Sequence, residues 1–318
     1  MTAARAMLDE IHPSLSPPPS DHTTYVLGRI GKHNIVIACL PKGETGNNSA
    51  ATVATRMSST FSSIRFGLMV GIGGGVPSKT HDIRLGDVVV STPSGQHGGV
   101  VQWDFGKTTK GGRFERTGTL NRPPAVLMTA LSTLDSTHYL EESQIPKYLE
   151  EMKTKYPKLA PKYTRQASMS DILFKADYEH ADTNDTCDSC DTRKTVSRTV
   201  RDDVAIHYGL VASGNQVMKD GIKRDEIGKD LGGVLCFDME AAGLMNEFPC
   251  AVIRGICDYA DSHKNMHWQG YAAATAAAFA KELLTTIPPN QVVDTRTVRD
   301  VVSKALSQAV SEASESTP

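Results

Sequence analysis

The sequence predicts an α/β protein of three layers, in which helices cover both faces of a mixed, largely parallel sheet. Short apolar runs typical of buried strands alternate with longer segments rich in alanine, leucine and methionine, which are typical of helices. Carboxylates directly follow two of the strands, at the sheet edge where ligands of open α/β folds bind. Hydrophobic residues make up 39% of the chain and charged residues 22%, as in globular proteins with a real core.

The first part of the chain predicts two helices and a hairpin. A helix is expected over Ala3–Ile11, and the proline-rich stretch Pro13–Ser20 is expected to be a surface loop. Tyr25–Ile30 and Asn34–Leu40 are short apolar runs joined by Gly-Lys-His, which predicts a β-hairpin. The alanine-rich segment Asn47–Met57 predicts a helix with an asparagine cap.

The middle of the chain continues the alternation. Phe66–Val70 predicts a buried strand that runs into a turn over Gly71–Gly75. Asp87–Ser91 predicts a second strand, and Pro124–Leu134 predicts a helix. Val204–Val211 predicts a further strand, which leads into a polar turn.

Residues 233–261 carry the strongest pattern, a strand–helix–strand unit with acidic residues at both strand ends. The first strand ends in Asp238-Met-Glu240, Glu240–Glu247 predicts a helix, and the second strand, Ala251–Cys257, ends at Asp258. Such carboxylates can bind sugar hydroxyls, exchange a proton with a leaving group, or hold a metal. Trp268–Leu284 predicts a final helix.

Two regions depart from this alternation. Residues 141–200 are polar and predict an insertion with a helix near Ile145–Tyr156. We therefore expect one domain over residues 1–286 and a helical and disordered tail over 287–318. One apolar face is predicted on the tail helix, formed by Val298, Val301, Val302, Leu306 and Val310.

The composition of the chain bears on its binding partners and on its cellular location. The net charge of −2 gives no general attraction for nucleic acid or an anionic membrane. The longest apolar run, Tyr271–Ala280, is too short to span a bilayer. A signal peptide would have an apolar stretch near the N-terminus, but charged residues interrupt this segment of the chain. Six scattered cysteines suggest reduced thiols, so a cytoplasmic location is expected.

Five motifs follow one another along the chain: GLMVGIGGG (67–75), RLGDVVVS (84–91), HYGLVASGNQVM (207–218), FDMEAAG (237–243) and RGICDYAD (254–261). In this order they resemble the nucleoside phosphorylase and methylthioadenosine nucleosidase superfamily. More closely, VVQWDFGK (100–107) and WQGYAAATAAAFAKELL (268–284) resemble the phosphorylase-like domain of fungal NLR-like proteins. The resemblance covers roughly residues 1–286 and implies cleavage of the bond between a ribose and a purine.

The resemblance implies a role for each site residue. Asp258 matches the general acid that protonates the departing purine, with Cys257 where the family usually has serine. Glu240 matches the acceptor for the ribose hydroxyls, and Met239 matches the residue that packs on the sugar. The base is expected between Val217 and Met218, while Asp238 is expected to have only a helix-terminal role. Asn215 is also expected to contact the substrate.

The glycine-rich segment bears on whether phosphate or water is the acceptor. Family phosphorylases place an arginine and a serine or threonine against phosphate, and this chain has Met69 and Ile72 there. Neither side chain can donate a hydrogen bond, so water is favoured and the reaction is expected to be hydrolysis. Gly73 and Gly74 would then allow the backbone to approach the nucleoside.

The N-terminal segment is a second departure. Family members usually carry a strand and an acidic residue before the helix that matches Ala3–Ile11, and in nucleosidases this acid activates the water. Both are expected to be absent, which would expose a sheet edge. Glu44 and Asp104 are the candidate replacements, each with a solvated loop charge as the simpler interpretation. A phosphorolytic enzyme and a catalytically weak ligand-sensing domain stay open as alternatives.

Three other features of the sequence give little indication of function. Cys187-Asp-Ser-Cys190 is a single CxxC pair in a polar segment, so no metal site is predicted from it. His263 and His267 lie four residues apart without an HExxH pattern, and Arg224 is expected on a solvated face. No cofactor is expected apart from phosphate as a co-substrate, and a homo-oligomer that binds a small nucleoside or nucleotide is expected.

Overall fold

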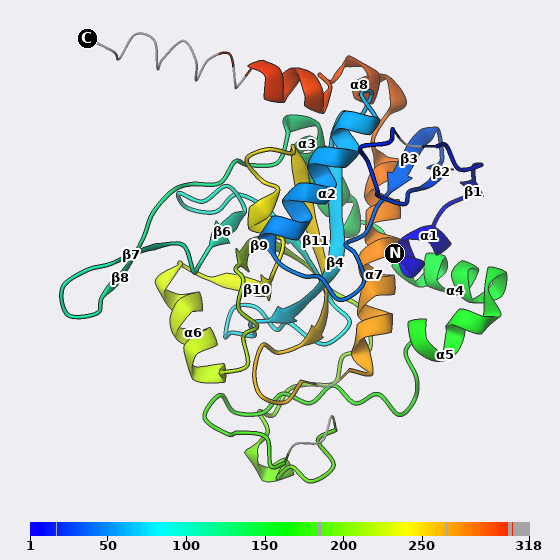
Figure 1. Cartoon of the computed structure of the whole chain (residues 1–318). Coiled ribbons are helices and arrows are strands. Elements are labelled where there is room, and N and C mark those ends of the chain that lie inside the picture. Colours follow the sequence, from blue (N-terminus) through cyan, green and yellow to red (C-terminus); the bar gives the residue numbers. More distant parts are fainter. Residues whose placement is uncertain (17, 183–185, 265, 305–306, 308–318) are drawn as a thin grey trace.

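The central sheet of the computed structural model has the strand order β10-β4-β11-β5-β9-β6 (Figure 1). The model describes all residues except 17, 183–185, 265, 305–306 and 308–318. The strands of the central sheet are β4 (Gly67–Gly75), β5 (Val88–Ser91), β6 (Val100–Gln102), β9 (Ile206–Ser213), β10 (Val234–Asp238) and β11 (Cys250–Asp258).

Two smaller sheets and the helices surround this sheet. Strands β1 (Glu10–Ile11), β2 (Val26–Ile30) and β3 (His33–Ile37) form one small sheet, and β7 (Gly106–Thr108) and β8 (Phe114–Arg116) form an arm that projects from the body (Figure 1). The helices are α1 (Thr2–Ala6), α2 (Asn47–Thr60), α3 (Ala125–His138), α4 (Ile145–Lys155), α5 (Ala160–Tyr163), α6 (Gly221–Asp230), α7 (Trp268–Thr286) and α8 (Pro289–Asp294).

The strand pairings close on themselves. Strand β10 pairs with β4 at one side and with β9 at the other, so β4, β11, β5, β9 and β10 are linked in a ring. The pairs β4–β11, β5–β9, β6–β9 and β9–β10 are parallel, while β4–β10 and β5–β11 are antiparallel. The predicted mixed, largely parallel sheet is confirmed, and the ring fixes the strand ends relative to one another.

Helices cover the sheet on both sides, which confirms the three layers. On one side, Val88, Val90 and Ile253 pack in a core with Phe279 of α7 and Leu127 of α3. A second core on the other side combines other residues of the same strands with α2 and with the segment after β10. Its members include Val89, Val252, Ile256, Ala50, Ala54 and Met245. Alternate residues of each strand therefore face different helices, as the pleat requires.

Several predicted elements are confirmed with small changes at their ends. Strands β2 and β3 form the expected antiparallel hairpin, and the predicted final helix is α7. The helix expected over Ala3–Ile11 was predicted too long, because it ends at Ala6 and Glu10–Ile11 pairs with β2. Helix α2 begins at Asn47, but its cap is Gly46 with a φ of 97°, and no side chain caps it.

The glycine-rich turn and the helix after β10 were predicted wrongly. Residues Gly71–Gly75 continue β4 as a strand, because their backbone pairs with β11 and, at the last two positions, with β10. Within Glu240–Glu247 only the short 3₁₀ turn Ala241–Gly243 forms, and Asp238 and Ser213 accept hydrogen bonds from the amides of Ala241 and Ala242 at its start. Neither segment forms the free loop or full helix that local composition indicates.

The insertion and the C-terminal segment both pack on the domain. The helix predicted near Ile145–Tyr156 is α4, whose Ile145 and Met152 are buried in the core. Beyond α8, residues 298–304 are helical, and Val298 is 1% exposed. The predicted apolar face is only partly seen: Val302 packs on the core, Val301 is 40% exposed, and Leu306 and Val310 lie outside the described residues.

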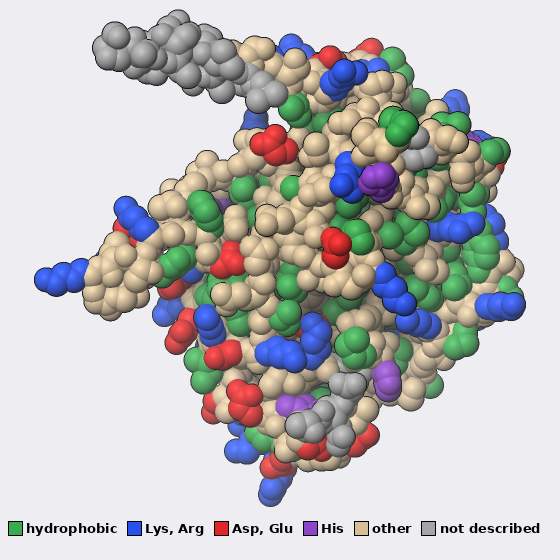
Figure 2. All heavy atoms as spheres, in the orientation of Figure 1, with side chains coloured by type: hydrophobic (Ala, Val, Ile, Leu, Met, Phe, Trp, Pro, Cys, Tyr) green, Lys and Arg blue, Asp and Glu red, His purple; other side chains and the backbone are tan. Residues whose placement is uncertain are grey.

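The surface carries both signs of charge. Figure 2 shows lysine and arginine side chains interspersed with aspartate and glutamate over the face it displays. This mixture agrees with the net charge of −2 over the chain. Among the described residues, no helix combines the length and the apolar character needed to cross a membrane.

Candidate active site

Asp258 ends β11 at a change of register. Ile256 pairs with Gly73 of β4, but Asp258 pairs with Gly74, so β11 carries one extra residue, Cys257, at this point. Such a bulge turns the next side chain away from the regular alternation of the strand, and bulges often serve this purpose beside active sites. The Asp258 residue is only 5% exposed, and acidic residues are rarely buried to this extent.

The carboxylate of Asp258 is fully engaged. Oδ1 accepts a hydrogen bond from the Ala260 amide at 2.9 Å. Oδ2 accepts from the Cys257 thiol at 3.2 Å and lies 3.1 Å from the ammonium group of Lys264. Cys257 therefore takes the position expected for the family's serine, with a weaker donor.

Lys264 is the charge partner of Asp258, and sequence reasoning missed it. Burial opposes the ammonium charge, but the carboxylate of Asp258, with a smaller contribution from Cys257, outweighs it, so the pKa of Lys264 is raised above its ordinary value. Lys264 therefore stays protonated at neutral pH beside the predicted general acid. The only sequence signal was its place in the loop after RGICDYAD.

Arg254 contacts two further acidic residues, Asp238 and Glu240. Its guanidinium contacts the carboxylate of Asp238 directly and lies 3.5 Å from Oε2 of Glu240. The side chains of Arg254 and Asp238 are 4% and 0% exposed, and that of Glu240 is 17% exposed. The nearby Asp238 and Glu240 carboxylates overcome the cost of burial and raise the pKa of Arg254.

Asp238 consequently has more than the helix-terminal role expected for it. Its Oδ2 accepts from the Ala241 amide at 3.1 Å, as predicted for a carboxylate at the start of a turn. The same oxygen also holds Arg254, which in turn reaches Glu240. Glu240 therefore has Arg254 as its charged partner, while part of its side chain stays accessible to solvent.

Gly73 and Gly74 of β4 lie beside the side chains of Arg254 and Asp258. A Cβ on Gly73 would be 2.9 Å from the Phe237 carbonyl oxygen and 3.4 Å from Cβ of Arg254. A Cβ on Gly74 would be 2.7 Å from Oδ1 of Asp258. Both positions need glycine because β10 and β11 approach β4 closely, and both glycines are buried. Gly73 therefore lies against Arg254, the partner of Glu240, and the adjacent Gly74 lies against Asp258.

The turn after β9 brings the remaining predicted residues together. The Asn215 amide donates to Oδ2 of Asp104 at 2.7 Å, and its side-chain oxygen accepts from the Asn47 amide at 3.1 Å, at the start of α2. Glu44 precedes the same helix, is exposed, and accepts a hydrogen bond from Ser49 at 2.9 Å. Asp104 and Glu44 thus lie on segments that meet at Asn215.

The residues expected to hold the base differ in burial. Met218 is 8% exposed and packs with Phe237 and Ala260, beside the Asp258 loop. Val217 is 50% exposed, and Met239 is half-buried after β10. Met218 can offer an apolar wall next to Asp258, while Val217 offers an exposed apolar surface.

Arg224 corrects the prediction of a solvated face on α6. It is 3% exposed, donates to the Tyr259 carbonyl at 2.7 Å and lies 3.6 Å from Oδ2 of Asp261. Burial raises the pKa of Asp261, although Arg224 and the His263 amide work in the opposite direction. Arg224 therefore anchors the loop that follows Asp258.

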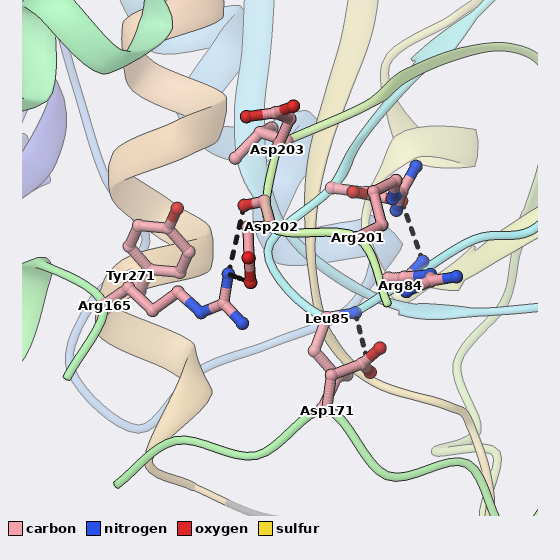
Figure 3. Close-up of a pocket in the computed structure, with 10 residues that line it drawn as sticks. Arg84, Leu85, Arg165, Asp171, Arg201, Asp202, Asp203 and Tyr271 are labelled. Carbon is pink, nitrogen blue, oxygen red and sulfur yellow. Dashed lines mark hydrogen bonds and ion pairs between the residues drawn. The ribbon is translucent and has the colours of Figure 1, made fainter. Parts of the chain in front are cut away.

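A separate pocket lies beside the start of β5 (Figure 3). Its charges are largely paired within the protein: Arg201 lies 2.6 Å from Asp87, and Arg165 lies 3.7 Å from Asp202. Asp87 also accepts from His207 at 2.8 Å. We assign Asp87 the role of joining β5 to β9, because its carboxylate is already bonded to Arg201 and His207.

Comparison with known proteins gives one family and one close relative. The family model described as "Phosphorylase superfamily" matches residues 9–287. A "Nucleotide-binding leucine-rich repeat (NLR)-like protein" of Hyaloscypha variabilis is 47% identical over 301 residues. The match covers 94% of this chain but only 29% of the relative, so the chain spans less than a third of that protein's length.

Solved structures share the fold at low sequence identity. The native futalosine hydrolase of Helicobacter pylori aligns with a TM-score of 0.55 at 15% identity, over 89% of this chain and 92% of that one. The 5'-methylthioadenosine/S-adenosylhomocysteine nucleosidase from Neisseria meningitidis, in complex with methylthio-immucillin-A, aligns with a TM-score of 0.56 at 16% identity. That alignment covers 90% of this chain and 96% of the other. At these identities the likeness establishes the fold alone.

Proposed function

The chain belongs to the phosphorylase superfamily, and from that premise we propose that it cleaves the N-glycosidic bond of a purine nucleoside or nucleotide with water as the acceptor. The observation that carries the proposal is the buried carboxylate of Asp258 at the bulged end of β11, with Glu240 held by Arg254 of the same strand. The nucleoside-cleaving enzymes among the structural neighbours support the reaction class.

The proposed reaction assigns a task to each acid. As the bond between C1′ and N9 breaks, its electron pair moves to the purine, and Asp258 in its protonated form gives a proton to N7. The water oxygen bonds to C1′ and its proton passes to a base. Glu240 accepts hydrogen bonds from the ribose hydroxyls while Arg254 keeps its carboxylate in place.

Lys264 occupies one oxygen of the proposed acid. Oδ2 of Asp258 lies 3.1 Å from the ammonium group of Lys264, while Oδ1 accepts a hydrogen bond from the Ala260 amide at 2.9 Å. We propose that a purine that reaches Oδ2 displaces Lys264 from this oxygen.

Water is favoured over phosphate for two reasons. The glycine segment 71–75 is paired within the sheet, so its amides do not form an anion-binding loop. Met69, where an arginine is expected in phosphorylases, contacts Arg254 through its sulfur at 3.5 Å, and that arginine is already neutralised by two acids. A phosphate ion would lack a charged partner at this position.

Glu44 is the better candidate for activating the water. Both oxygens of Asp104 accept hydrogen bonds, from Gln102 at 3.3 Å and from Asn215 at 2.7 Å. In Glu44, one oxygen accepts from Ser49, and among the described residues no hydrogen bond was found to the other. We therefore assign Asp104 to positioning the Asn215 turn and Glu44 to the water.

The experiment that tests the proposal measures free adenine from adenosine, methylthioadenosine and ATP, with and without phosphate. We expect Asp258→Asn to reduce base release at least about a hundredfold, because a general acid contributes on this scale. Glu44→Gln is expected to lower the rate similarly, while Asp230→Asn, a change of an exposed acid at the end of α6, leaves it unchanged. Full activity in Asp258→Asn would contradict the mechanism, and ribose 1-phosphate as product would contradict hydrolysis.

A second function is favoured by the relative rather than by the site. The NLR-like name of the Hyaloscypha protein agrees with a domain that binds a purine ligand and signals without turnover. Calorimetry with adenosine separates the two: binding without base release would support the sensing function. A cytoplasmic location and a homo-oligomer, both expected from the sequence and the resemblance, remain part of the proposal.

A further inference from the structure

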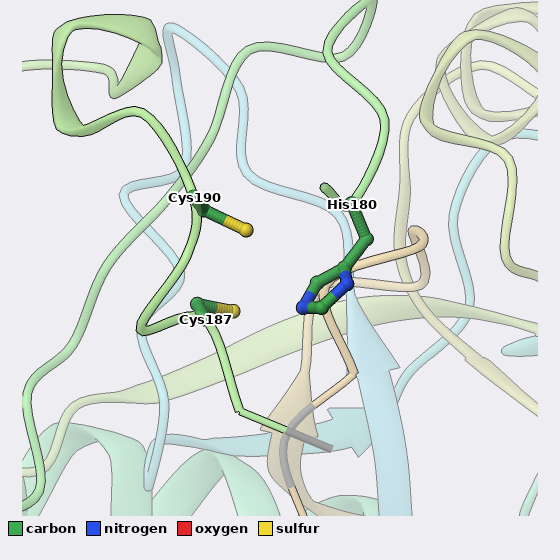
Figure 4. Close-up of side chains that lie close together, drawn as sticks. All are labelled: His180, Cys187 and Cys190. Atoms are coloured by element: carbon green, nitrogen blue, oxygen red, sulfur yellow. The ribbon is translucent and has the colours of Figure 1, made fainter. Parts of the chain in front are cut away.

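Three metal-binding side chains meet in the polar insertion. His180, Cys187 and Cys190 each offer one ligand atom, and these atoms lie within 4.8 Å of one another. Figure 4 shows the imidazole of His180 beside the two sulfur atoms. The amide of Cys190 donates to the Cys187 carbonyl at 3.1 Å, so the CxxC pair forms a tight turn that places both thiols on one side.

Both ring nitrogens of His180 lie within hydrogen-bond distance of a backbone carbonyl oxygen, so a metal at Nε2 would take the place of the Thr186 carbonyl. Nδ1 lies 2.7 Å from the Asp182 carbonyl oxygen, and Nε2 lies 3.0 Å from that of Thr186. A neutral imidazole has a single N–H, so it can satisfy only one of these two acceptors. Donation from Nδ1 to a backbone carbonyl is the usual second contact of a metal-binding histidine, and it leaves the lone pair on Nε2.

His263 supplies an independent sign that a ligand is needed here. Its side chain is 4% exposed, yet neither ring nitrogen has a hydrogen-bond partner among the described residues. The nearest carboxylate oxygen, Oδ1 of Asp261, is 3.8 Å from Nδ1, which is beyond hydrogen-bond range. A buried imidazole without a partner is costly, unless something else binds its nitrogen.

His263 lies beside the cluster, although its ring nitrogens do not belong to the group of ligand atoms within 4.8 Å of one another. Its ring centroid lies 5.5 Å from that of His180, and its carbonyl oxygen lies 4.0 Å from the sulfur of Cys187. Phe174 stacks on the His263 ring at 4.1 Å, and Tyr178 lies at 5.3 Å. This aromatic packing holds the ring in one orientation and shields the group from water.

We propose that the chain binds a structural zinc ion through His180, Cys187, Cys190 and His263. Two thiolates and two imidazoles are a common closed, tetrahedral ligand set for zinc. In such a site the ligand atoms are separated by roughly 3.3–3.8 Å, given bond lengths of about 2.3 Å to sulfur and about 2.0–2.1 Å to nitrogen. The site would form if the His180, Cys187 and Cys190 atoms moved closer together and a ring nitrogen of His263 moved in beside them. The CxxC sequence alone did not predict this site.

The proposed ion would join the insertion to the loop after β11. The His180 amide donates to Oγ of Ser262 at 3.0 Å, and the His263 amide donates to Asp261 at 2.9 Å. Lys264, the partner of Asp258, directly follows His263. The zinc would thus fix the segment that carries Lys264, without contacting a substrate.

Metal analysis of the purified 318-residue chain is the direct test. We expect zinc in a ratio close to one ion per chain after gel filtration, and a cobalt-substituted sample with thiolate charge-transfer absorption and tetrahedral visible bands. Cys187→Ser, Cys190→Ser and His180→Ala should each lower the zinc content at least about tenfold. Cys39→Ser, a change of an exposed thiol outside the cluster, should keep it.

Two further measurements keep the test decisive if a variant folds poorly. His263→Gln should weaken zinc binding and change the cobalt spectrum, whereas an unchanged spectrum would remove His263 from the site. After zinc removal, amide exchange should rise in residues 258–264 and stay constant in α7. A zinc-free wild-type chain, or a Cys187–Cys190 disulfide in thiol titration, would overturn the proposal.

Discussion

At the scale of single residues, this chain departs from the usual pattern in which charged side chains lie on the surface. Arg254, Asp238 and Asp258 each lie in the interior, and each is matched by an opposite charge. Removing one member of such a pair leaves an uncompensated buried charge, which is far more costly than losing an exposed ion pair. The chain keeps these charges beside the strand ends, where the proposed chemistry needs them.

Asp21 shows the same principle outside the site. It is 6% exposed and accepts hydrogen bonds from the Tyr25 hydroxyl at 2.6 Å and the Thr23 amide at 2.9 Å. Thr60, at the end of α2, donates to the same carboxylate. Burial alone would raise the pKa of Asp21, but these donors outweigh it and lower the pKa below 3.8.

This shift predicts how stability depends on pH. The ionised Asp21 stabilises the fold above pH 3.8, and the contribution is lost as the pH falls toward its lower folded value. Asp21→Asn should lower the free energy of unfolding at pH 7 by about 2 kcal/mol, since the donors lose a charged acceptor. Urea denaturation at several pH values should show a flatter acid limb in this variant.

The matched control is Asp230→Asn, because Asp230 is an exposed aspartate at the end of α6. An equal loss of stability in both variants would contradict the assignment of Asp21.

At the scale of elements, the β4 glycines show how packing overrides local signals. Residues 71–75, whose composition predicts a turn, form the end of a strand because their backbone pairs with β11 and β10. Glycine at four of these five positions permits the close approach of the neighbouring residues. The bulge in β11 belongs to the same arrangement, since it places Asp258 opposite Gly74. Strand geometry and acid placement are thus one structural feature.

Gly74→Ala tests this coupling. Its Cβ would lie 2.7 Å from Oδ1 of Asp258 and 2.8 Å from Cβ of Ala260, so the Asp258 loop must move. We expect a loss of about 1–3 kcal/mol in stability and at least about a tenfold loss of base release. Chemical denaturation and the adenine assay measure the two effects separately.

The control substitution is Gly228→Ala in α6. Its Cβ would meet only Cγ1 of Val76, at an ordinary 3.5 Å. Alanine is the better helix former, so stability should rise by about 0.5–1 kcal/mol with unchanged activity. Normal activity in Gly74→Ala would show that the close approach of β4 is not needed to place Asp258.

At the scale of the whole molecule, the closed ring of strands ties distant parts of the chain together. Strands β4, β9 and β11 each pair with two or more others, so no central strand can leave without breaking several pairings. Along Gly67–Gly73, however, β4 is paired in the described residues with β11 alone. The ring is therefore least supported at this edge.

The segment after α7 also contributes to the fold. Val298 is buried, its amide donates to the Ile64 carbonyl at 2.8 Å, and Arg65 donates to the Thr295 carbonyl at 2.7 Å. A chain that ends at Ile287 should lose about 2–4 kcal/mol relative to one that ends at Lys304, from lost apolar burial and hydrogen bonding. Thermal unfolding of the two truncated chains measures this difference, and equal midpoints would show that the segment is dispensable.

The sequence by itself determined the α/β class, the order of most elements and the acids at the strand ends. These follow from short-range patterns: apolar runs, alanine-rich periodicity and the position of each carboxylate at the end of a run. The five motifs, taken in order, also determined the family. The sequence placed Asp258, Glu240 and Met218 in the candidate site because each lies within or beside a motif.

Only the tertiary structure decided which charges are paired and which side chains meet. Lys264 beside Asp258, Arg254 between Asp238 and Glu240, and Arg224 beneath the Asp258 loop are contacts that no local pattern encodes. The same holds for His263, which lies 76 residues after Cys187 in the chain and close to it in space. Such contacts depend on the register and closure of the sheet, and those are set by packing of the whole domain rather than by any segment alone.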